Sequence, residues 1–482
     1  MPASFHIEHF GCRAARADGE AVSDRLRSAG HSIQQPARAD VVIVNTCSVT
    51  AEADRAARAF IRRAHRLNPA ARIVVTGCYA QRAPQELAAL PGVAAVVGNS
   101  HKALAPQIAQ RLMEPAPTPP GTELIQIQAA TKPERAASEQ LAPPQVAQVV
   151  WADDRFAHSF LEEAQLVPGS QTRPNLKIQE GCGNRCTFCV IPLTRGPSRS
   201  LPHAAILRQV EGFVAAGGNE LVLSGINLGR WGRDLPAGEG ASRPALAALV
   251  RQIFRETALP RLRLSSIEPM DWDDELIGLL AEFGGSRLAR HAHLPLQSGS
   301  DAVLRRMHRR YRPWHYAEKV AALLRAAGPE LTLGADVMVG FPGETGVEFE
   351  ETVAQVRALP FGYLHLFPFS PRPGTPGWAL HAGRPVSARV VEERMAVLRA
   401  LAAEKSEIHR RRFVGRELEA ITLHTPANAG RRGRTAALTE NFLPVKIEGR
   451  LPANRLLRVR IAGLAADGAL EAGAVSRSTF SA

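Results

Sequence analysis

The sequence predicts an α/β protein: an N-terminal parallel-sheet domain, a partial β/α barrel and a small C-terminal all-β barrel. Three observations support this prediction. A length of 482 residues suits two to four domains. Short β-like runs alternate with helical patterns over residues 1–112 and again, at larger scale, over 174–405, which is typical of parallel sheets covered by helices. Residues 413–482 instead hold β-patterned runs joined by turns, which favours a small barrel.

The first region, residues 1–112, reads as a βαβαβα unit. Helical patterns occupy 14–30, 51–67 and 80–90, with Gly30 and Asn68-Pro69 as stop signals. The predicted strands between them are FHIEHF, DVVIVN, RIVVTG and VAAVVG. We therefore expect one parallel sheet with helices on its faces.

The remaining chain divides into three further parts. Residues 113–173 are rich in Pro, Ala and Gln, which predicts a linker or surface insertion. Residues 174–412 hold six predicted strands, fewer than the eight of a closed β/α barrel, and a long helical pattern over 386–412. These strands read NLKIQ, ELVLSG, RLRLSS, HAHLPLQ, LTLGADVMVG and YLHLFPF. Residues 413–482 form the predicted barrel, with ELEAITLH, TAALTENFLPVKIEG and NRLLRVRIAGL as its β-patterned segments.

The positive charge is concentrated at the two ends of the chain. Residues 1–112 hold 14 Lys and Arg against 8 Asp and Glu, and residues 410–482 hold 13 against 6, whereas the middle is neutral. This distribution indicates a catalytic core between parts that hold a polyanion such as nucleic acid. No apolar run approaches the roughly 18 residues of a membrane span, and the first twenty residues lack a signal-peptide core. We expect a cytoplasmic protein, in which cysteines are more often ligands than disulfides.

Cys182, Cys186 and Cys189 form a C-x3-C-x2-C pattern directly after the first predicted strand of the barrel. Loops at the carboxyl ends of barrel strands carry the chemistry of such enzymes. Three thiolates on one loop can hold three irons of a 4Fe–4S cluster and leave the fourth iron open to an external ligand. A structural zinc site would need a fourth protein ligand, and no His or Cys follows at a suitable spacing. The pattern therefore favours iron–sulfur over zinc.

Cys12, Cys47 and Cys78 lie just past the ends of three predicted parallel strands, in FGC, NTC and TGC. The carboxyl ends of parallel strands meet at one edge of the sheet, so we expect these thiols to lie together. Free cysteines are often simply small buried hydrophobic residues. Core cysteines would lie inside the strands, however, and not three times at the same end. We interpret the three as ligands of a second cluster with one open iron.

The spacing of the barrel cysteines resembles that of the radical S-adenosylmethionine superfamily, and Phe188 fills the aromatic position before the last cysteine. The resemblance implies that the open iron binds S-adenosylmethionine, which is cleaved to a 5′-deoxyadenosyl radical. Together with the second triad, the chain resembles the methylthiotransferase family over almost its whole length. The motifs are NTCSVT, VTGCYAQ, LKIQEGCGNRCTFCVIPLTRG, HLPLQSGSDAVLRRMHRRY, DVMVGFPGE and LHLFPFSPRPGTP.

Within that family the chain is most similar to the branch that modifies N6-threonylcarbamoyladenosine at tRNA position 37. The resemblance implies two 4Fe–4S clusters, insertion of a methylthio group at C2 of that adenine, and two S-adenosylmethionine molecules per turnover. It also implies a tRNA substrate, an electron donor, a sulfur source and a TRAM-like, RNA-binding C-terminal barrel. The family usually has an Asn a few residues after its first cysteine, where this chain reads GCRAARADGE.

Three other functions stay open at this point. One is methylthiolation of isopentenyl-adenosine in tRNA, and another is methylthiolation of a ribosomal protein side chain. The third is an iron–sulfur RNA-binding protein without activity, which would not explain the polar residues at the barrel strand ends. Only a cofactor-derived radical can remove hydrogen from C2 of adenine, an unactivated sp2 carbon.

Polar and small residues at the ends of the predicted barrel strands are candidates for the cofactor pocket. Gly225 would allow close approach of the cofactor, and the other candidates would supply hydrogen bonds. An ordinary role in turns or helix caps is an equal alternative for each of them. The candidates are Ser224, Gly225, Ser265, Ser266, Glu268, Gln297 and Asp336.

Arginines in two regions are candidates for contact with the phosphate backbone of RNA. The first group lies in MHRRYR, close to the pocket strands. The second lies in a turn and a strand of the C-terminal barrel, a fold whose surface often binds RNA. The candidates are Arg309, Arg310, Arg312, Arg431, Arg432, Arg434, Arg458 and Arg460.

Overall fold

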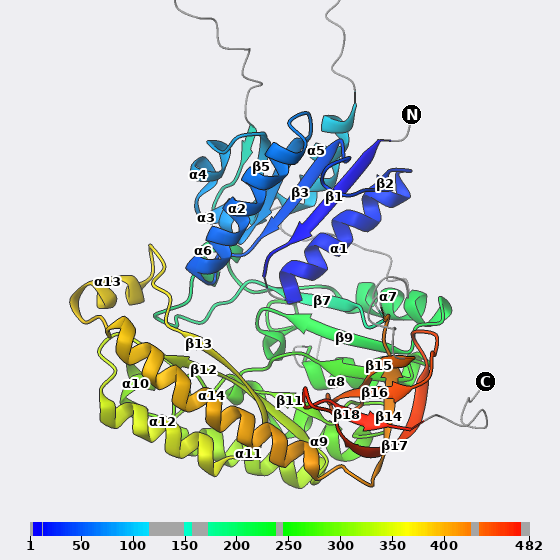
Figure 1. The fold of residues 1–482 in the computed structure, drawn as a ribbon, viewed down its shortest axis with the longest axis vertical. Helices are drawn as coiled ribbons and strands as arrows, with labels where there is room; N and C mark the ends of the chain where they lie inside the picture. The colour runs from blue at the N-terminus through cyan, green and yellow to red at the C-terminus, as the bar shows by residue number, and fades with distance from the viewer. Residues whose placement is uncertain are drawn as a thin grey trace, which may run out of the picture.

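The computed structural model describes residues 3–11, 13–114, 149–156, 172–237, 244–425 and 433–473. It confirms the predicted fold class, with a parallel-sheet domain, a partial β/α barrel and a closed five-stranded barrel. In Figure 1 the blue N-terminal sheet stands above the green and yellow barrel, and the red C-terminal strands lie at one side of that barrel. No described helix has both the length and the apolar character needed to cross a membrane.

The N-terminal domain is a six-stranded parallel sheet with helices on both faces. The spatial order of its strands is β2 (Ser32–Ile33), β1 (Ser4–His9), β3 (Val41–Thr46), β4 (Arg72–Gly77), β5 (Val93–Gly98) and β6 (Val149–Trp151). One face is covered by α1 (Arg13–Ser28) and α5 (Ala105–Met113). The other face is covered by α2 (Ala51–Leu67), α3 (Cys78–Arg82) and α4 (Pro84–Ala88), while the 3-10 helix η1 (Asn99–Leu104) follows β5.

The residues of this sheet explain its position between two helix layers. Strand β3 is buried at every position, as a parallel strand covered on both faces requires. Helix α2 begins where the Thr50 hydroxyl accepts a hydrogen bond from Ala53 N at 3.2 Å. Strand β6 comes from within residues 113–173, which the sequence predicts to be a linker or insertion, yet it pairs with β5 as an edge strand of the sheet. Residues 115–148 and 157–171 of that range lie outside the described residues.

The partial barrel contains the six predicted parallel strands. They are β7 (Asn175–Glu180), β9 (Glu220–Gly225), β10 (Arg261–Leu264), β11 (His291–His293), β12 (Thr332–Val339) and β13 (Phe361–Pro368). An isolated parallel bridge joins Leu262 in β10 to Leu288, which precedes β11 along the chain. A short strand β8 (Arg199–Ser200) pairs antiparallel with β7.

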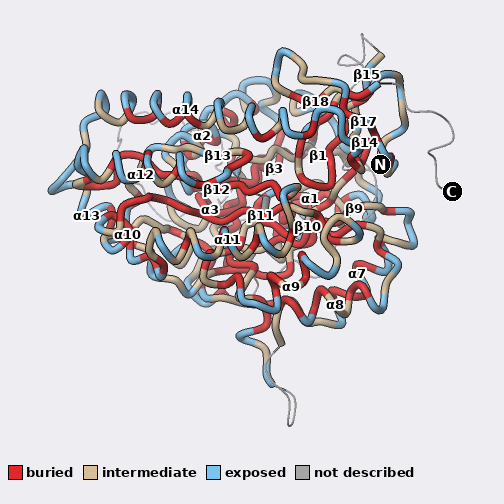
Figure 2. The backbone as a smooth tube through the Cα atoms, turned by 90° about the horizontal axis from the view of Figure 1, so that it is seen from below, coloured by how far each residue is buried: buried red, intermediate tan, exposed pale blue. Residues whose placement is uncertain are grey.

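Helices cover the outer side of these strands. Those in the crossovers are α7 (His203–Ala215), α8 (Leu246–Glu256), α9 (Asp274–Phe283), α11 (Pro313–Ala327) and α12 (Gly346–Ala358). The predicted long helix is α14 (Ala388–Arg411), and shorter helices are α6 (Ile191–Arg195), η2 (Leu228–Arg230), η3 (Pro269–Asp271), α10 (Asp301–Arg306) and α13 (Pro376–Gly383). Figure 2 shows β11 and β12 buried between helices whose outer turns are exposed, whereas β13 is buried only at its first two residues. These helices and strands share one large hydrophobic core.

The C-terminal barrel is closed in the order β14-β15-β16-β18-β17. Its strands are β14 (Glu417–Thr422), β15 (Arg434–Thr439), β16 (Pro444–Glu448), β17 (Leu456–Leu464) and β18 (Leu470–Ala472). The predicted segment TAALTENFLPVKIEG is thus a hairpin of two strands, because the chain turns at Phe442, whose φ is 67°. Strand β18 has no counterpart among the predicted segments.

The C-terminal barrel is docked on the amino-terminal ends of the partial-barrel strands. The Phe442 ring stacks on His291 at a ring distance of 4.3 Å and packs at a tilt against Tyr363 at 5.4 Å, and the Arg263 guanidinium lies over the Phe442 ring. Beneath this contact, buried Glu220 accepts from Arg263 Nε at 2.8 Å and from Arg261. The end of the partial barrel opposite the cysteine loop is therefore closed by the hairpin turn of the last domain.

Candidate functional site

The loop of residues 181–190 joins β7 to α6 and carries three cysteines. Cys182 N donates to Gly196 O at 3.1 Å, and Cys189 N donates to Cys186 O at 3.1 Å. Thr187, in the middle of the loop, bonds through its N and hydroxyl to the backbone of residues 306–307. The loop is thus fixed to both sides of the barrel mouth, and the prediction that it follows the first barrel strand is confirmed.

The three thiols of this loop crowd one another in a partly buried place. Burial, together with the neighbouring Cys186 and Cys182 sulfurs, raises the pKa of Cys189 to about 12. Burial also raises the pKa of Cys182, although Asn184 N and Asn227 Nδ2 donate to its sulfur at 3.4 and 3.6 Å. Three adjacent thiols of this kind ionise readily only when a bound cation compensates the negative charge of the thiolates. Their chemistry therefore fits an iron cluster held by Cys182, Cys186 and Cys189.

A cavity of about 330 Å³ opens directly beside this loop. Its polar lining offers backbone groups, two carboxylate oxygens and several guanidinium groups, which is suitable for a zwitterionic ligand. The lining residues are Gly183, Asn184, Arg185, Cys186, Arg230, Glu268, His308, Arg309 and Arg310. Of the residues predicted to bind the cofactor, Glu268 lines this cavity.

The other predicted cofactor residues lie elsewhere. Ser224 is buried and its hydroxyl donates to Leu176 O at 3.4 Å, while a Cβ on Gly225 would meet Gln179. Ser265 and Gln297 are also buried, and Gln297 has a φ of 61°. Phe188 packs, half-buried, against the large core. Their contact with a cofactor stays a prediction.

Arg309 is not available for the RNA contact that the sequence predicts. Its side chain is 4% exposed, and Arg309 Nη1 lies 3.3 Å from Cys186 Sγ. The same guanidinium pairs with Glu268 and lies over the Tyr311 ring. The expectation of a phosphate contact at Arg309 is therefore wrong, because the guanidinium is buried beside a cysteine of the loop.

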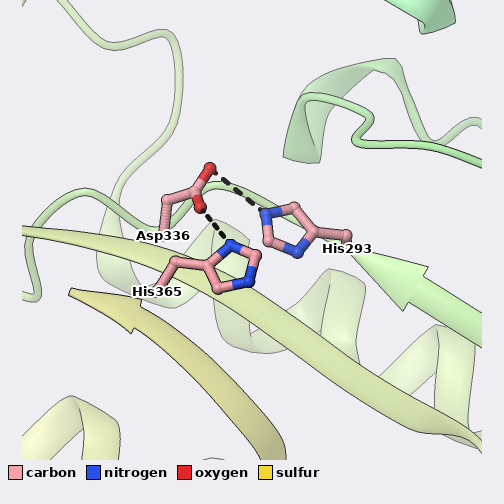
Figure 3. A group of neighbouring side chains, drawn as sticks. All are labelled: His293, Asp336 and His365. Atoms are coloured by element: carbon pink, nitrogen blue, oxygen red, sulfur yellow. Dashed lines mark hydrogen bonds and ion pairs between the residues drawn. The ribbon is translucent and has the colours of Figure 1, made fainter. Parts of the chain in front are cut away.

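A polar cluster lies deeper in the barrel, on three neighbouring strands (Figure 3). His293 Nε2 is 3.1 Å from Asp336 Oδ2, and His365 Nδ1 is 3.2 Å from Asp336 Oδ1. The Tyr363 hydroxyl hydrogen-bonds to His293 Nδ1 at 2.9 Å. Burial opposes ionisation of Asp336, but the two imidazoles outweigh it and hold the pKa of this carboxyl below its usual range.

This cluster projects from the side of the strands that the outer helices do not cover. Ala335 and Val337 lie in the helix-covered core, and side chains alternate along a strand. Asp336 and its register partner His365 therefore face the concave side of the partial barrel. Asp336 was predicted to contact the cofactor, but the structure places its carboxylate between two histidines.

The second set of cysteines lies at the edge of the N-terminal sheet that faces the barrel. Cys47 and Cys78 directly follow Thr46 and Gly77, which are paired in register on β3 and β4. Both cysteines are buried. Gly11 lies against Cys47, since a Cβ on Gly11 would be 3.0 Å from Cys47 Sγ. Cys12 itself lies outside the described residues.

Charged residues near Cys78 were missed by the sequence analysis. Arg195 Nε and Asn99 Nδ2 each lie 3.3 Å from Cys78 Sγ. Arg195 is completely buried and pairs with Glu180, which stands two residues before Cys182. Charged residues within a predicted strand, such as Lys177 and Glu180 in β7, are the sequence signal that could have found this contact.

The remaining predicted RNA-binding arginines have varied surroundings. The Arg310 side chain is half exposed and lines the cavity, while Arg312 pairs with Asp301 at 3.1 Å. In the C-terminal barrel, Arg458 and Arg460 stand opposite Glu419 and Glu417 on the neighbouring strand. Arg434 pairs with Glu471, and Arg431 and Arg432 lie outside the described residues. RNA contact by these residues stays a prediction.

Comparisons with known proteins agree with this arrangement. Residues 4–98 match the family described as uncharacterized protein family UPF0004, and residues 176–356 match the radical SAM superfamily. The threonylcarbamoyladenosine tRNA methylthiotransferase MtaB of Aquifex aeolicus is 33% identical over 456 residues, which cover 94% of this chain and 99% of the relative. MtaB of Bacillus subtilis is 34% identical, covering 92% and 90%. The tRNA-2-methylthio-N(6)-dimethylallyladenosine synthase of Erythrobacter litoralis is 34% identical, covering 89% and 88%.

Proposed function

Since this chain belongs to the radical S-adenosylmethionine tRNA methylthiotransferase family, we propose that its substrate is N6-threonylcarbamoyladenosine at tRNA position 37. The product would carry a methylthio group at C2 of that adenine. Relatives named for this nucleoside and for dimethylallyladenosine have similar identities to this chain. The choice between the two therefore needs an observation within the barrel.

The polar cluster of His293, Asp336 and His365 is that observation. A threonylcarbamoyl group carries a carboxylate, a hydroxyl and a urea, whereas a dimethylallyl group is a hydrocarbon. The His365 side chain is 59% exposed, and the ring nitrogen that does not contact Asp336 points away from the carboxylate (Figure 3). It offers this nitrogen to a polar group on the concave side of the barrel. A site built for hydrogen bonding rejects an analogue that leaves its polar groups unpaired.

We propose that each cysteine triad holds one 4Fe–4S cluster, with Cys182, Cys186 and Cys189 in the barrel and Cys12, Cys47 and Cys78 in the sheet domain. When bound, the barrel cluster with S-adenosylmethionine supplies the radical that removes the C2 hydrogen. Asn227 and Arg309 donate to the sulfurs of Cys182 and Cys186 and orient them. Arg309 in turn holds Glu268 in the wall of the cavity, where this carboxylate meets the cofactor.

In this proposal the substrate adenine lies between the two triads. The sheet domain presents Cys78 toward α6 and the barrel loop, so the proposed sulfur-carrying cluster lies on the side of the barrel mouth. An anticodon-loop adenine must be unstacked to enter, as bases of single-stranded RNA can be. The identities of the electron donor and of the sulfur source are open in this proposal.

Nucleoside mass spectrometry tests the substrate. We expect tRNA from a strain lacking this gene to accumulate unmodified N6-threonylcarbamoyladenosine and to regain its methylthio derivative on complementation. Accumulation of dimethylallyladenosine instead would overturn the choice of branch.

A His365→Leu variant sharpens the same test. It should lose methylthiolation while retaining 5′-deoxyadenosine formation, because the barrel cysteines and their cavity are untouched. If the His365→Leu variant methylthiolates threonylcarbamoyladenosine at the normal rate, His365 does not recognise the substrate.

A further inference from the structure

Five charged side chains are buried where the N-terminal sheet domain meets the partial barrel. Asp18 on α1 and Lys102 on η1 come from the sheet domain. Lys177 and Glu180 on β7 and Arg195 at the end of α6 come from the barrel. Each of these side chains is at most 7% exposed. Buried charges are costly unless they are paired, so this cluster fixes the two domains in one relative position.

Ion pairs of this cluster join a cation of each domain to a carboxylate of the other domain. Lys102 Nζ lies 2.9 Å from Asp18 Oδ2 and 2.8 Å from Glu180 Oε2. Arg195 Nη1 lies 2.5 Å from Glu180 Oε1 and 3.2 Å from Asp18 Oδ2. Lys177 completes the group by pairing with both carboxylates. Each carboxylate is thus shared between cations from both domains.

Three consecutive residues at the end of α6 connect this cluster to cysteines of both triads. Thr194 O accepts from Asn99 Nδ2 at 2.9 Å, and the same amide nitrogen lies 3.3 Å from Cys78 Sγ. Arg195 Nε lies 3.3 Å from Cys78 Sγ. Gly196 O accepts from Cys182 N at 3.1 Å. One short segment therefore contacts Cys78 in the sheet domain and Cys182 in the barrel.

The charges of the cluster also favour an anionic sulfur beside it. Three cations face two carboxylates, which leaves one surplus positive charge, and Arg195 directs a donor at Cys78 Sγ. Cysteine sulfur is a thiolate when it binds metal. Hydrogen bonds to the sulfurs of a cluster tune its reduction potential.

We propose that Arg195 is a positioning residue that couples the two cysteine sites: it sets the orientation of Cys78 relative to the barrel loop and stabilises the reduced state of the sheet-domain cluster. This inference rests on the proposed two-cluster function. Arginine suits the role because its planar fork can donate to a sulfur and a carboxylate at once, which the single ammonium of lysine cannot do in the same geometry.

The first test isolates the sheet-domain cluster in a protein that carries C182A, C186A and C189A. In this background R195Q should lower the midpoint potential of the remaining cluster and change its electron paramagnetic resonance spectrum. The matched control is R372Q. Arg372 also makes a buried contact between the domains, at 2.7 Å from Asp54 Oδ2, and its described contacts include no cysteine. R372Q should leave both measurements unchanged.

The second test uses the protein with both triads intact and compares 5′-deoxyadenosine with methylthiolated product. R195Q should raise this ratio about tenfold or more, the size expected when a partner of a metal ligand is lost. R195K should fall between R195Q and wild type, and it serves as the working variant if R195Q yields little folded protein. R372Q should keep the wild-type ratio.

The outcomes separate this inference from the proposed function. If reconstituted wild-type protein holds only one cluster, the proposed function fails whatever Arg195 does. If wild type holds two clusters, but R195Q and R372Q lower the melting temperature alike and leave the potential, the spectrum and the ratio unchanged, Arg195 is only an interdomain contact and the inference is overturned.

Discussion

The two cysteine sites are built in opposite ways. The barrel site takes its three thiols from one loop, residues 181–190, so local sequence alone brings Cys182, Cys186 and Cys189 together. The sheet site takes Cys47 and Cys78 from the ends of two strands, and they meet only because Thr46 and Gly77 are paired in register. One site is therefore specified by a motif and the other by a fold.

The largest expected effect comes from removing the barrel thiols. A C182A/C186A/C189A protein should form no 5′-deoxyadenosine and should hold about half of the roughly eight irons of the reconstituted wild type, since we propose that each triad holds one 4Fe–4S cluster. Iron analysis and chromatography of the nucleoside measure both. Loss of all iron, or of none, would contradict two separate sites.

Removing the sheet thiols should have a narrower effect. A C12A/C47A/C78A protein should still cleave S-adenosylmethionine, because only the barrel triad has the spacing of a radical enzyme. It should form no methylthiolated nucleoside. If a folded variant of this kind stops making 5′-deoxyadenosine, the two sites do not have the separate roles described above.

Two glycines allow each site to be disturbed through the backbone. Gly77 has a φ of 100°, and a Cβ there would lie 2.3 Å from Thr46 O. Gly181 has a φ of 70°, and its Cβ would lie 2.0 Å from Pro197 O. Alanine at either position should cost about 1–3 kcal/mol through forced backbone shifts.

The two substitutions should affect different sites. G77A should reduce iron at the sheet site and spare radical formation, whereas G181A should do the reverse. G278A is the control, because a Cβ at Gly278 on the outer helix α9 meets nothing within 4 Å. Spectroscopy of each reconstituted variant measures the iron at the two sites. Equal iron loss at both sites in G77A would contradict the expectation that Gly77 supports only the sheet site.

The smallest expected effect is a pH dependence of the contact between the sites. Burial opposes ionisation of Glu180 and Asp18, but Arg195, Lys102 and Lys177 outweigh it and hold the pKa of both carboxyls below the usual range. Stability from a depressed carboxyl pKa is fully present above the unfolded-state value and is lost as pH falls through the folded-state value. Denaturant unfolding of the cluster-free protein should therefore show less stability at pH of about 3 than at about 7. The E180Q protein should lose less stability between pH of about 7 and about 3 than the wild type. An equal loss of stability would show that the Glu180 carboxylate is not the cause.

The barrel loop, and the place of Cys47 and Cys78 at the ends of two strands, could be predicted from the sequence because local pattern marks where each strand ends. Arg195 could not be assigned in this way, since its contact with Cys78 joins residues 117 positions apart. Arg309 was misread because a basic run in a sequence looks solvent-exposed, while the fold buries this member against Cys186. The sequence also could not predict that two predicted RNA-binding arginines lie opposite glutamates on the neighbouring strand. These pairs, Arg458 with Glu419 and Arg460 with Glu417, depend on strand register, which the periodicity of a single strand does not determine.

The position of Phe442 has a consequence for the order in which the chain is made. The ring that packs on His291 and Tyr363 at the floor of the partial barrel belongs to a domain that leaves the ribosome after the partial barrel. A nascent chain that ends before this hairpin has all six cysteines but lacks the floor of its barrel. A chain interrupted at that point would therefore carry its cysteines in a partial barrel whose amino-terminal end stays open to water.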